Sequence, residues 1–168
     1  MVVEASSICA GATGFTTGKV TSQHSLIYAA LEKRQGADQT RVFAQAQQAA
    51  IERIVAIAHN ESIECDIRRA TAFVYTEDSD KESEFAEELE AALRCGLPAR
   101  RAAGDIGLPW EVEDAIAFAN QVAFHPRRYC LGLAGQIVRR GGVLRPGRDA
   151  HSSPRRRPRA RTRRRGSR

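Results

Sequence analysis

An acidic residue closes a short apolar run at the start of the sequence. Val2 and Val3 read as a buried strand, and Glu4 follows them with a carboxylate. A carboxylate on a rigid strand end can accept hydrogen bonds from both hydroxyls of an adenosine ribose in dinucleotide-binding βαβ units, where it follows a G-x-G-x-x-G turn by roughly 20 residues. Glu4 is therefore a candidate ribose ligand, and the alternative is an ordinary exposed charge.

A run rich in glycine and threonine follows this acid. Its glycines allow a phosphate group to approach the backbone closely and leave N–H groups free to donate, and its threonines add hydroxyl donors. The alternative is a polar loop that binds nothing. The candidate cofactor-binding residues of this run are Gly11, Thr13, Gly14, Thr16, Thr17, Gly18 and Lys19.

A second stretch with chemical potential runs from Asn120 to Tyr129 and contains Phe124-His125-Pro126. Pro126 is typical of the first position of a helix, so we favour a capping or packing role for His125 over catalysis. Tyr129, one turn further on, could face a substrate cavity or fill the core. His125 and Tyr129 are the candidate substrate-side residues. The sequence contains no Ser-His-Asp arrangement, metal-ligand cluster or Walker loop.

Both stretches resemble FAD-dependent oxidoreductases of the D-amino-acid-oxidase type, in the branch whose flavin domain is often fused to a Rieske iron–sulfur domain. The run from Thr16 to His24, followed by Leu26-Ile27-Tyr28, is the most specific part, and the second stretch follows at a fitting spacing. The likeness covers residues 2 to about 142. It implies FAD as cofactor and flavin-mediated dehydrogenation of a small amine or hydroxy acid, with Lys19 near the pyrimidine edge of the flavin or paired with a helix acid.

The resemblance also predicts the fold class, a mixture of α+β and α/β. We expect a partial FAD-binding Rossmann-like domain joined to part of an antiparallel-sheet substrate domain. On this interpretation residues 1–142 form a partial oxidoreductase domain whose G-x-G-x-x-G turn is absent upstream. The chain is then expected to be a truncated, inactive form that does not retain FAD.

The last part of the sequence differs sharply in charge from the rest. Residues 139–168 hold 13 arginines, no lysine and one acid, whereas residues 1–138 hold 13 basic and 19 acidic side chains. The Arg/Pro-rich composition of residues 143–168 predicts a disordered tail. We favour the interpretation that this tail results from a frameshift or truncation and has no evolved role. The alternative is a small non-enzymatic protein whose tail binds nucleic acid non-specifically through phosphate contacts.

The four cysteines are far apart in the sequence, with no C-x-x-C pair and none of the cysteine–histidine pairs that hold a Rieske cluster. This spacing favours a reducing compartment and predicts no metal centre. The sequence shows no signal peptide and no apolar run of about 20 residues, so we predict a cytoplasmic protein without membrane contact.

Hydrophobic spacing predicts the elements that must position these residues. Helical periodicity predicts a short helix capped by Ser25 that breaks near Gly36, and three further helices over 38–59, 80–95 and 126–140. Alternation predicts a strand over 63–67 with a hairpin partner over 72–76, and a strand over 115–118. By the resemblance, these strands belong to the substrate side, and helices 38–59 and 126–140 pack about the flavin domain.

Overall fold

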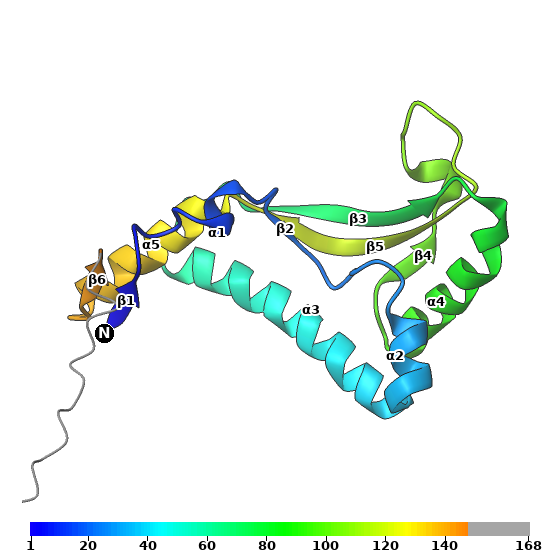
Figure 1. Cartoon of the computed structure of the whole chain (residues 1–168), viewed down its shortest axis with the longest axis horizontal. Helices are drawn as coiled ribbons and strands as arrows, with labels where there is room; N and C mark the ends of the chain where they lie inside the picture. The colour runs from blue at the N-terminus through cyan, green and yellow to red at the C-terminus, as the bar shows by residue number, and fades with distance from the viewer. Residues whose placement is uncertain (148–168) are drawn as a thin grey trace, which may run out of the picture.

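The computed structural model describes residues 1–147 of the 168-residue chain as a mixture of short strands and helices (Figure 1). Residues 148–168, which hold most of the predicted tail, lie outside the described part. The disorder and nucleic-acid binding predicted for that segment therefore stay predictions. No helix within residues 1–147 combines the length and apolar character needed to cross a lipid bilayer.

Two strands from opposite ends of the described chain lie side by side. β1 (Val2–Glu4) pairs in parallel with β6 (Leu144–Pro146), and the N–H of Val2 donates to the carbonyl oxygen of Val143 at 2.8 Å. β6 lies past residue 142, so the first residues of the predicted tail belong to the folded part of the chain.

A second sheet is antiparallel and is built around one long strand. β5 (Asp114–Ala123) pairs with β3 (Arg68–Thr76) along one side, and with β2 (Lys19–Val20) and β4 (Ala99–Arg101) along the other. β5 is the most buried strand because it has neighbours on both sides. The parallel pair and the antiparallel sheet together confirm the predicted fold class.

Helices join the two sheets and cover one face of the antiparallel one. α3 (Ala37–Asn60) spans the distance between the α2–α4 end of the molecule and the end that carries α5 (Figure 1). At the first end, α2 (Tyr28–Gln35) and α4 (Glu82–Arg94) pack against β5. The core there contains Tyr28, Ala44, Phe85, Ala91, Ala92, Ile116 and Phe118.

A buried carboxylate, and not the predicted serine cap, holds the start of α2. Glu88 of α4 is fully buried and accepts the N–H groups of Ile27 and Tyr28 at 3.0 Å each and that of Ala29 at 2.8 Å. Ser25 has a φ of 59° and makes no cap hydrogen bond to this helix, so the prediction for Ser25 is wrong. The start of α2 therefore depends on a residue about 60 positions later.

The predicted strand over 63–67 is also wrong. Ser62 and Asp66 have φ values of 51° and 53°, which interrupt an extended chain. Ile63 and Cys65 are buried because this segment packs on α5 (Pro126–Arg139) and on the end of α3, so their alternation reflects a loop that lies across two helices. β3 begins after this loop and pairs with β5, which also excludes the predicted hairpin.

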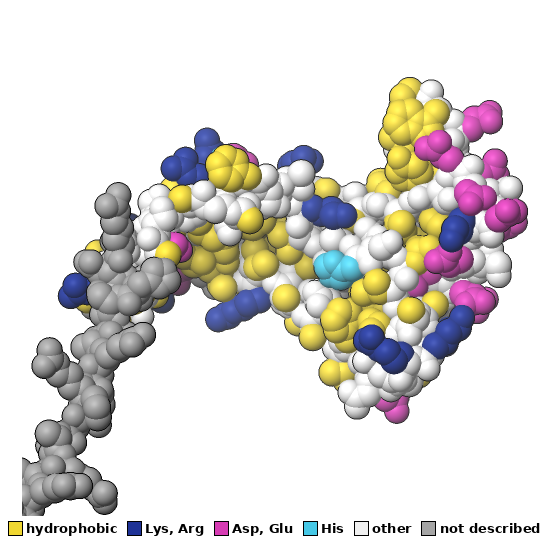
Figure 2. All heavy atoms as spheres, viewed as in Figure 1, with side chains coloured by type: hydrophobic (Ala, Val, Ile, Leu, Met, Phe, Trp, Pro, Cys, Tyr) yellow, Lys and Arg dark blue, Asp and Glu magenta, His cyan; other side chains and the backbone are white. Residues whose placement is uncertain are grey.

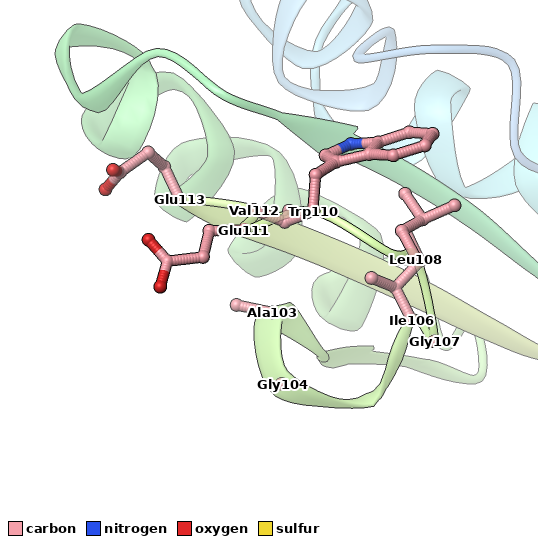
Figure 3. Close-up of a pocket in the computed structure, with 9 residues that line it drawn as sticks. All are labelled: Ala103, Gly104, Ile106, Gly107, Leu108, Trp110, Glu111, Val112 and Glu113. Carbon is pink, nitrogen blue, oxygen red and sulfur yellow. The ribbon is translucent and has the colours of Figure 1, made fainter.

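The α2–α4 end of the molecule also carries an acidic surface and a separate cleft. Acidic side chains gather where α4 and the turn before it face solvent (Figure 2). The connection between β4 and β5 encloses about 480 Å³, with Trp110, Leu108 and Ile106 on one side and Glu111 and Glu113 on the other (Figure 3). None of the predicted site residues lines this cleft.

Candidate functional site

Glu4 stands at the end of β1 with its side chain half-exposed. One carboxylate oxygen, Oε1, accepts the N–H of Ser6 at 3.2 Å, and the main-chain oxygen of Glu4 accepts the N–H of Gly147 at 3.1 Å. The strand end is thus fixed by its neighbour β6, and the second carboxylate oxygen remains open to a ligand. This arrangement is suited to accepting two hydroxyl hydrogens.

The glycine- and threonine-rich run forms a compact loop around α1 (Ala12–Phe15). A Cβ added to Gly14 would lie 2.3 Å from Cys9 O, and one added to Gly18, whose φ is 73°, would lie 2.1 Å from Phe124 O. These two glycines are required by the packing of the loop itself. Gly11 has open space where a side chain would stand, and the hydroxyl-bearing residues Thr13, Thr16 and Thr17 are exposed.

The two stretches singled out in the sequence lie against each other. The N–H of Phe124 donates to Gly18 O at 3.1 Å, and Lys19 pairs with Ala123 across β2 and β5. A cleft of about 420 Å³ opens at this junction, between the loop, the end of β5 and the start of α5. Its lining residues are Gly14, Thr16, Thr17, Asp66, Arg68, Ala123, Phe124, His125 and Pro126.

The cleft brings together some of the predicted site residues and leaves others apart. Gly14, Thr16 and Thr17 from the loop share it with His125 from the second stretch. The remaining candidates do not line this cleft, and they are Glu4, Gly11, Thr13, Gly18, Lys19 and Tyr129.

His125 occupies a structural position at the edge of this cleft. It precedes α5, its N–H donates to Cys65 O at 2.6 Å, and its Nδ1 accepts the N–H of Arg128 at 3.4 Å. Tyr129 is buried, and its ring meets that of Phe124 edge-on at 5.3 Å. Burial raises the pKa of Tyr129, so this phenol stays neutral in the core.

The electrostatics of the cleft favour an anion. The N-terminus of the 14-residue α5 opens on it, and helix N-termini attract negative charge. Arg68 lines the wall, and Asp66 is engaged by Arg128 at 2.7 Å. The donors on offer are hydroxyls and a guanidinium, a set that fits phosphate or carboxylate oxygens. The start of α5 adds its dipole but few free N–H groups, because Pro126 has none and that of Arg128 is accepted by His125 Nδ1.

A smaller cleft of about 310 Å³ adjoins the first and shares Thr17 and Ala123 with it. Lys19 lines this second cleft together with Ala70, Ala72 and Val122. Lys19 is exposed and forms no salt bridge with the carboxylates of the described chain, so the predicted pairing with a helix acid is not seen.

Sequence reasoning missed Asp66, Arg68 and Phe124 as residues of the cleft. Asp66 lies within the segment that reads as a strand and Arg68 follows that segment, and only the observed turn at Asp66 brings them to the start of α5. Phe124 belongs to the second stretch, and its position next to the candidate His125 was the sequence signal that could have identified it as a site residue. Among residues 1–147, no group of His, Cys, Asp or Glu side chains is arranged to hold a metal ion.

The family model described as FAD dependent oxidoreductase, of the D-amino-acid-oxidase type, matches residues 1–168. The chain belongs to this family. It is 32% identical over 144 residues to a Bacillus subtilis (strain 168) protein provisionally named a Rieske 2Fe-2S iron–sulfur protein. That alignment covers 86% of this chain and 28% of the relative, so the chain spans little more than a quarter of the relative's length. No solved structure gives a significant match.

Proposed function

We propose that this chain supplies part of the FAD site and part of the substrate-facing sheet of an oxidoreductase that dehydrogenates a small amine or hydroxy acid. Glu4 binds the adenosine ribose, and the loop from Gly11 to Gly18 binds the pyrophosphate. Lys19 places its charge near the pyrimidine edge of the flavin. When bound, FAD supplies the electron acceptor for the dehydrogenation.

The observation that carries this proposal is the convergence of the two stretches on one cleft. Thr16 and Thr17 face it from the loop, and His125 and Pro126 face it from the start of α5. Membership of a flavin-dependent family supports FAD as the ligand. Glu4 lies outside the cleft, and an extended dinucleotide accounts for this separation because its adenosine ribose and its pyrophosphate bind at different places.

The chain's own residues have separate tasks in this proposal. The loop and the α5 N-terminus offset the negative charge of the pyrophosphate, as helix N-termini and glycine-rich loops do. His125 acts as a positioning residue, because its bonds to Cys65 O and to the Arg128 N–H fix the start of α5 beside the loop. Tyr129 supports the same junction from the core.

FAD binding by the full chain tests the proposal, with flavin fluorescence as the readout. Replacement of both Thr16 and Thr17 by valine keeps their shape and removes two hydroxyl donors. We expect the dissociation constant for FAD to rise on the order of fivefold or more, while riboflavin, which lacks the pyrophosphate, is little affected. Ser83→Ala removes an exposed hydroxyl at the far end of the molecule and is the matched control. Equal FAD binding by all three proteins would contradict the proposal.

A further inference from the structure

One edge of the antiparallel sheet has no neighbour in the described part of the chain. β3 is nine residues long and pairs with β5 along one side, whereas β5 has β2 and β4 on its other side. No strand within residues 1–147 pairs with the second side of β3. A long strand edge with free backbone groups is a template for a further strand.

Backbone N–H and C=O groups point outward from this edge at alternate residues. Ala115 O accepts the N–H of Ala102 at 2.8 Å, so the backbone of Ala115 faces β4. Tyr75 is paired with Ala115, and its own N–H and C=O are therefore directed away from β5. Phe73 and Thr71 follow at the two-residue spacing of a strand and present their backbone groups to the same side. The edge thus offers a regular row of donors and acceptors.

β3 stays regular along this row although its neighbour β5 does not. The register between the two strands shifts between Ala70 and Ala72, where one residue of β3 lies opposite two residues of β5. Asn120 of β5 has a φ of 57° at this shift, so the irregularity belongs to β5. Residues 73–76 of β3 are all aromatic or β-branched, and such residues favour an extended strand.

The row is complementary to itself. When two copies of β3 lie antiparallel about a two-fold axis at Phe73, outward-pointing residues stand opposite each other. Phe73 then faces Phe73 of the second copy and Tyr75 faces Thr71, and each such pair exchanges both of its N–H···O bonds. Aromatic residues opposite each other add to the stability of an antiparallel pair. The arrangement uses the same residues of both copies, as a two-fold interface requires.

Opposite charges meet at both ends of this register. Continued past the end of β3, it places Glu77 opposite Arg69 and Asp78 opposite Arg68. Arg69 already binds Glu52, but Arg68 is exposed and forms no salt bridge among residues 1–147. Asp78 uses only Oδ1, which accepts a backbone N–H of the following turn at 3.0 Å. An axis one residue away in either direction would place Arg69 opposite an uncharged residue.

We propose that the β3 edge joins two copies of this chain into one continuous antiparallel sheet, in the register centred on Phe73. The inference goes beyond the proposed function and does not depend on it. Residues 148–168 are unsuited to this edge, because Pro154 and Pro158 have no N–H to donate and the arginines of that segment would meet the arginines that begin β3. A second copy instead brings the acids that match them.

Sedimentation velocity of the full chain over a range of concentrations tests the proposal. We expect a monomer–dimer equilibrium that Tyr75→Pro abolishes, because proline removes an outward N–H and no hydrogen bond to β5. Tyr75→Ala keeps this N–H and is the matched control, which should still form the dimer. Thermal unfolding of both variants verifies that they fold.

A charge exchange tests the register without altering the strand. Arg68→Asp places like charges opposite each other at both ends of the pairing and should raise the dissociation constant of the dimer on the order of tenfold. Arg68→Asp combined with Asp78→Arg should restore this constant to within about threefold. Arg34→Asp makes the same charge change away from the edge and should have little effect.

Amide hydrogen exchange locates the interface. The amides of Phe73 and Tyr75 should exchange more slowly at high protein concentration than at low concentration, because the dimer supplies their acceptors. A chain that stays monomeric at the concentrations used for NMR would overturn the proposal. So would a dimer that persists unchanged in Tyr75→Pro, or one that the charge exchange does not recover.

Discussion

The backbone N–H of Ser22 donates to Oε1 of Gln121 at 2.8 Å, and this buried contact ties together the two stretches that carry the family resemblance. The Ser22 hydroxyl lies 3.3 Å from the same oxygen, and the Gln121 amide donates to Ala119 O at 2.7 Å. The residues that follow Lys19 therefore hold β2 against β5. This contact fixes the position of the preceding loop from Gly11 to Gly18.

Gln121→Ala should destabilise the chain strongly. It leaves the buried Ser22 N–H without its acceptor and opens a cavity beside β5, which together cost about 2–4 kcal/mol of unfolding free energy. Gln39→Ala, on the exposed side of α3, should change it by less than about 0.5 kcal/mol. Urea unfolding of the three proteins measures the difference, and similar midpoints for all three would refute this role of Gln121.

Gly18→Ala and Gly36→Ala separate backbone strain from steric overlap. Both glycines have positive φ, 73° and 86°, but only at Gly18 would a Cβ meet another atom, 2.1 Å from Phe124 O. Gly36→Ala should cost about 1–3 kcal/mol from strain alone, because a ψ of 161° places this residue in a region that only glycine adopts readily. Gly18→Ala should cost about 3 kcal/mol or more, because β2 must also move away from β5. Thermal unfolding compares them, and equal losses would show that the loop relaxes freely.

Glu88→Ala should destabilise the α2–α4 end of the molecule. Three backbone N–H groups lose their buried acceptor, with an expected loss of about 2–4 kcal/mol. Glu87, the neighbouring acid, is exposed and contacts Lys33, so Glu87→Ala should have a much smaller effect. Amide hydrogen exchange of Tyr28 and Ala29 gives the local readout. Unchanged protection of these amides in Glu88→Ala would contradict the capping role.

The Cys130 thiol should become reactive toward alkylating reagents only at unusually high pH. Burial and a hydrogen bond with the Cys9 side chain raise the pKa of Cys130 to about 11. In the unfolded chain this thiol ionises at its ordinary, lower value. Its contribution to stability is therefore complete below that value and is lost as pH rises toward about 11. Alkylation of Cys130 by iodoacetamide, followed by peptide mass spectrometry, should rise with a midpoint near 11. A midpoint at the ordinary thiol value would contradict this environment.

Hydrophobic periodicity was a good guide to the helices and to two of the three predicted strands, since the segments over 72–76 and 115–118 lie within β3 and β5. The helices predicted over 38–59 and 126–140 correspond to α3 and α5, because a long amphipathic face is a local property of the sequence. The segment over 63–67 alternates for a different reason, since Ile63 and Cys65 are buried by the distant α5. A local pattern cannot distinguish these two sources of burial.

The candidate site was predictable to a similar extent. Thr16, Thr17 and His125 share a cleft, and the residue types of the two stretches indicated that both were of interest. Arg68 could not be assigned from the sequence, because its place depends on the register in which β3 and β2 both meet Ala123. The cap formed by Glu88 likewise depends on how α4 packs against α2, which is a tertiary property.

The ribose assignment of Glu4 is the central claim, and the ligand pair ADP and 2′-deoxy-ADP tests it directly. NMR titration of the full chain gives both dissociation constants, in the wild type, in Glu4→Gln and in Glu64→Gln, an exposed acid outside the site. If Glu4 accepts both ribose hydroxyls, the wild type and Glu64→Gln should prefer ADP on the order of fivefold. Glu4→Gln should bind the two ligands almost equally. A preference for ADP that survives unchanged in Glu4→Gln, or is absent from the wild type, would contradict the account.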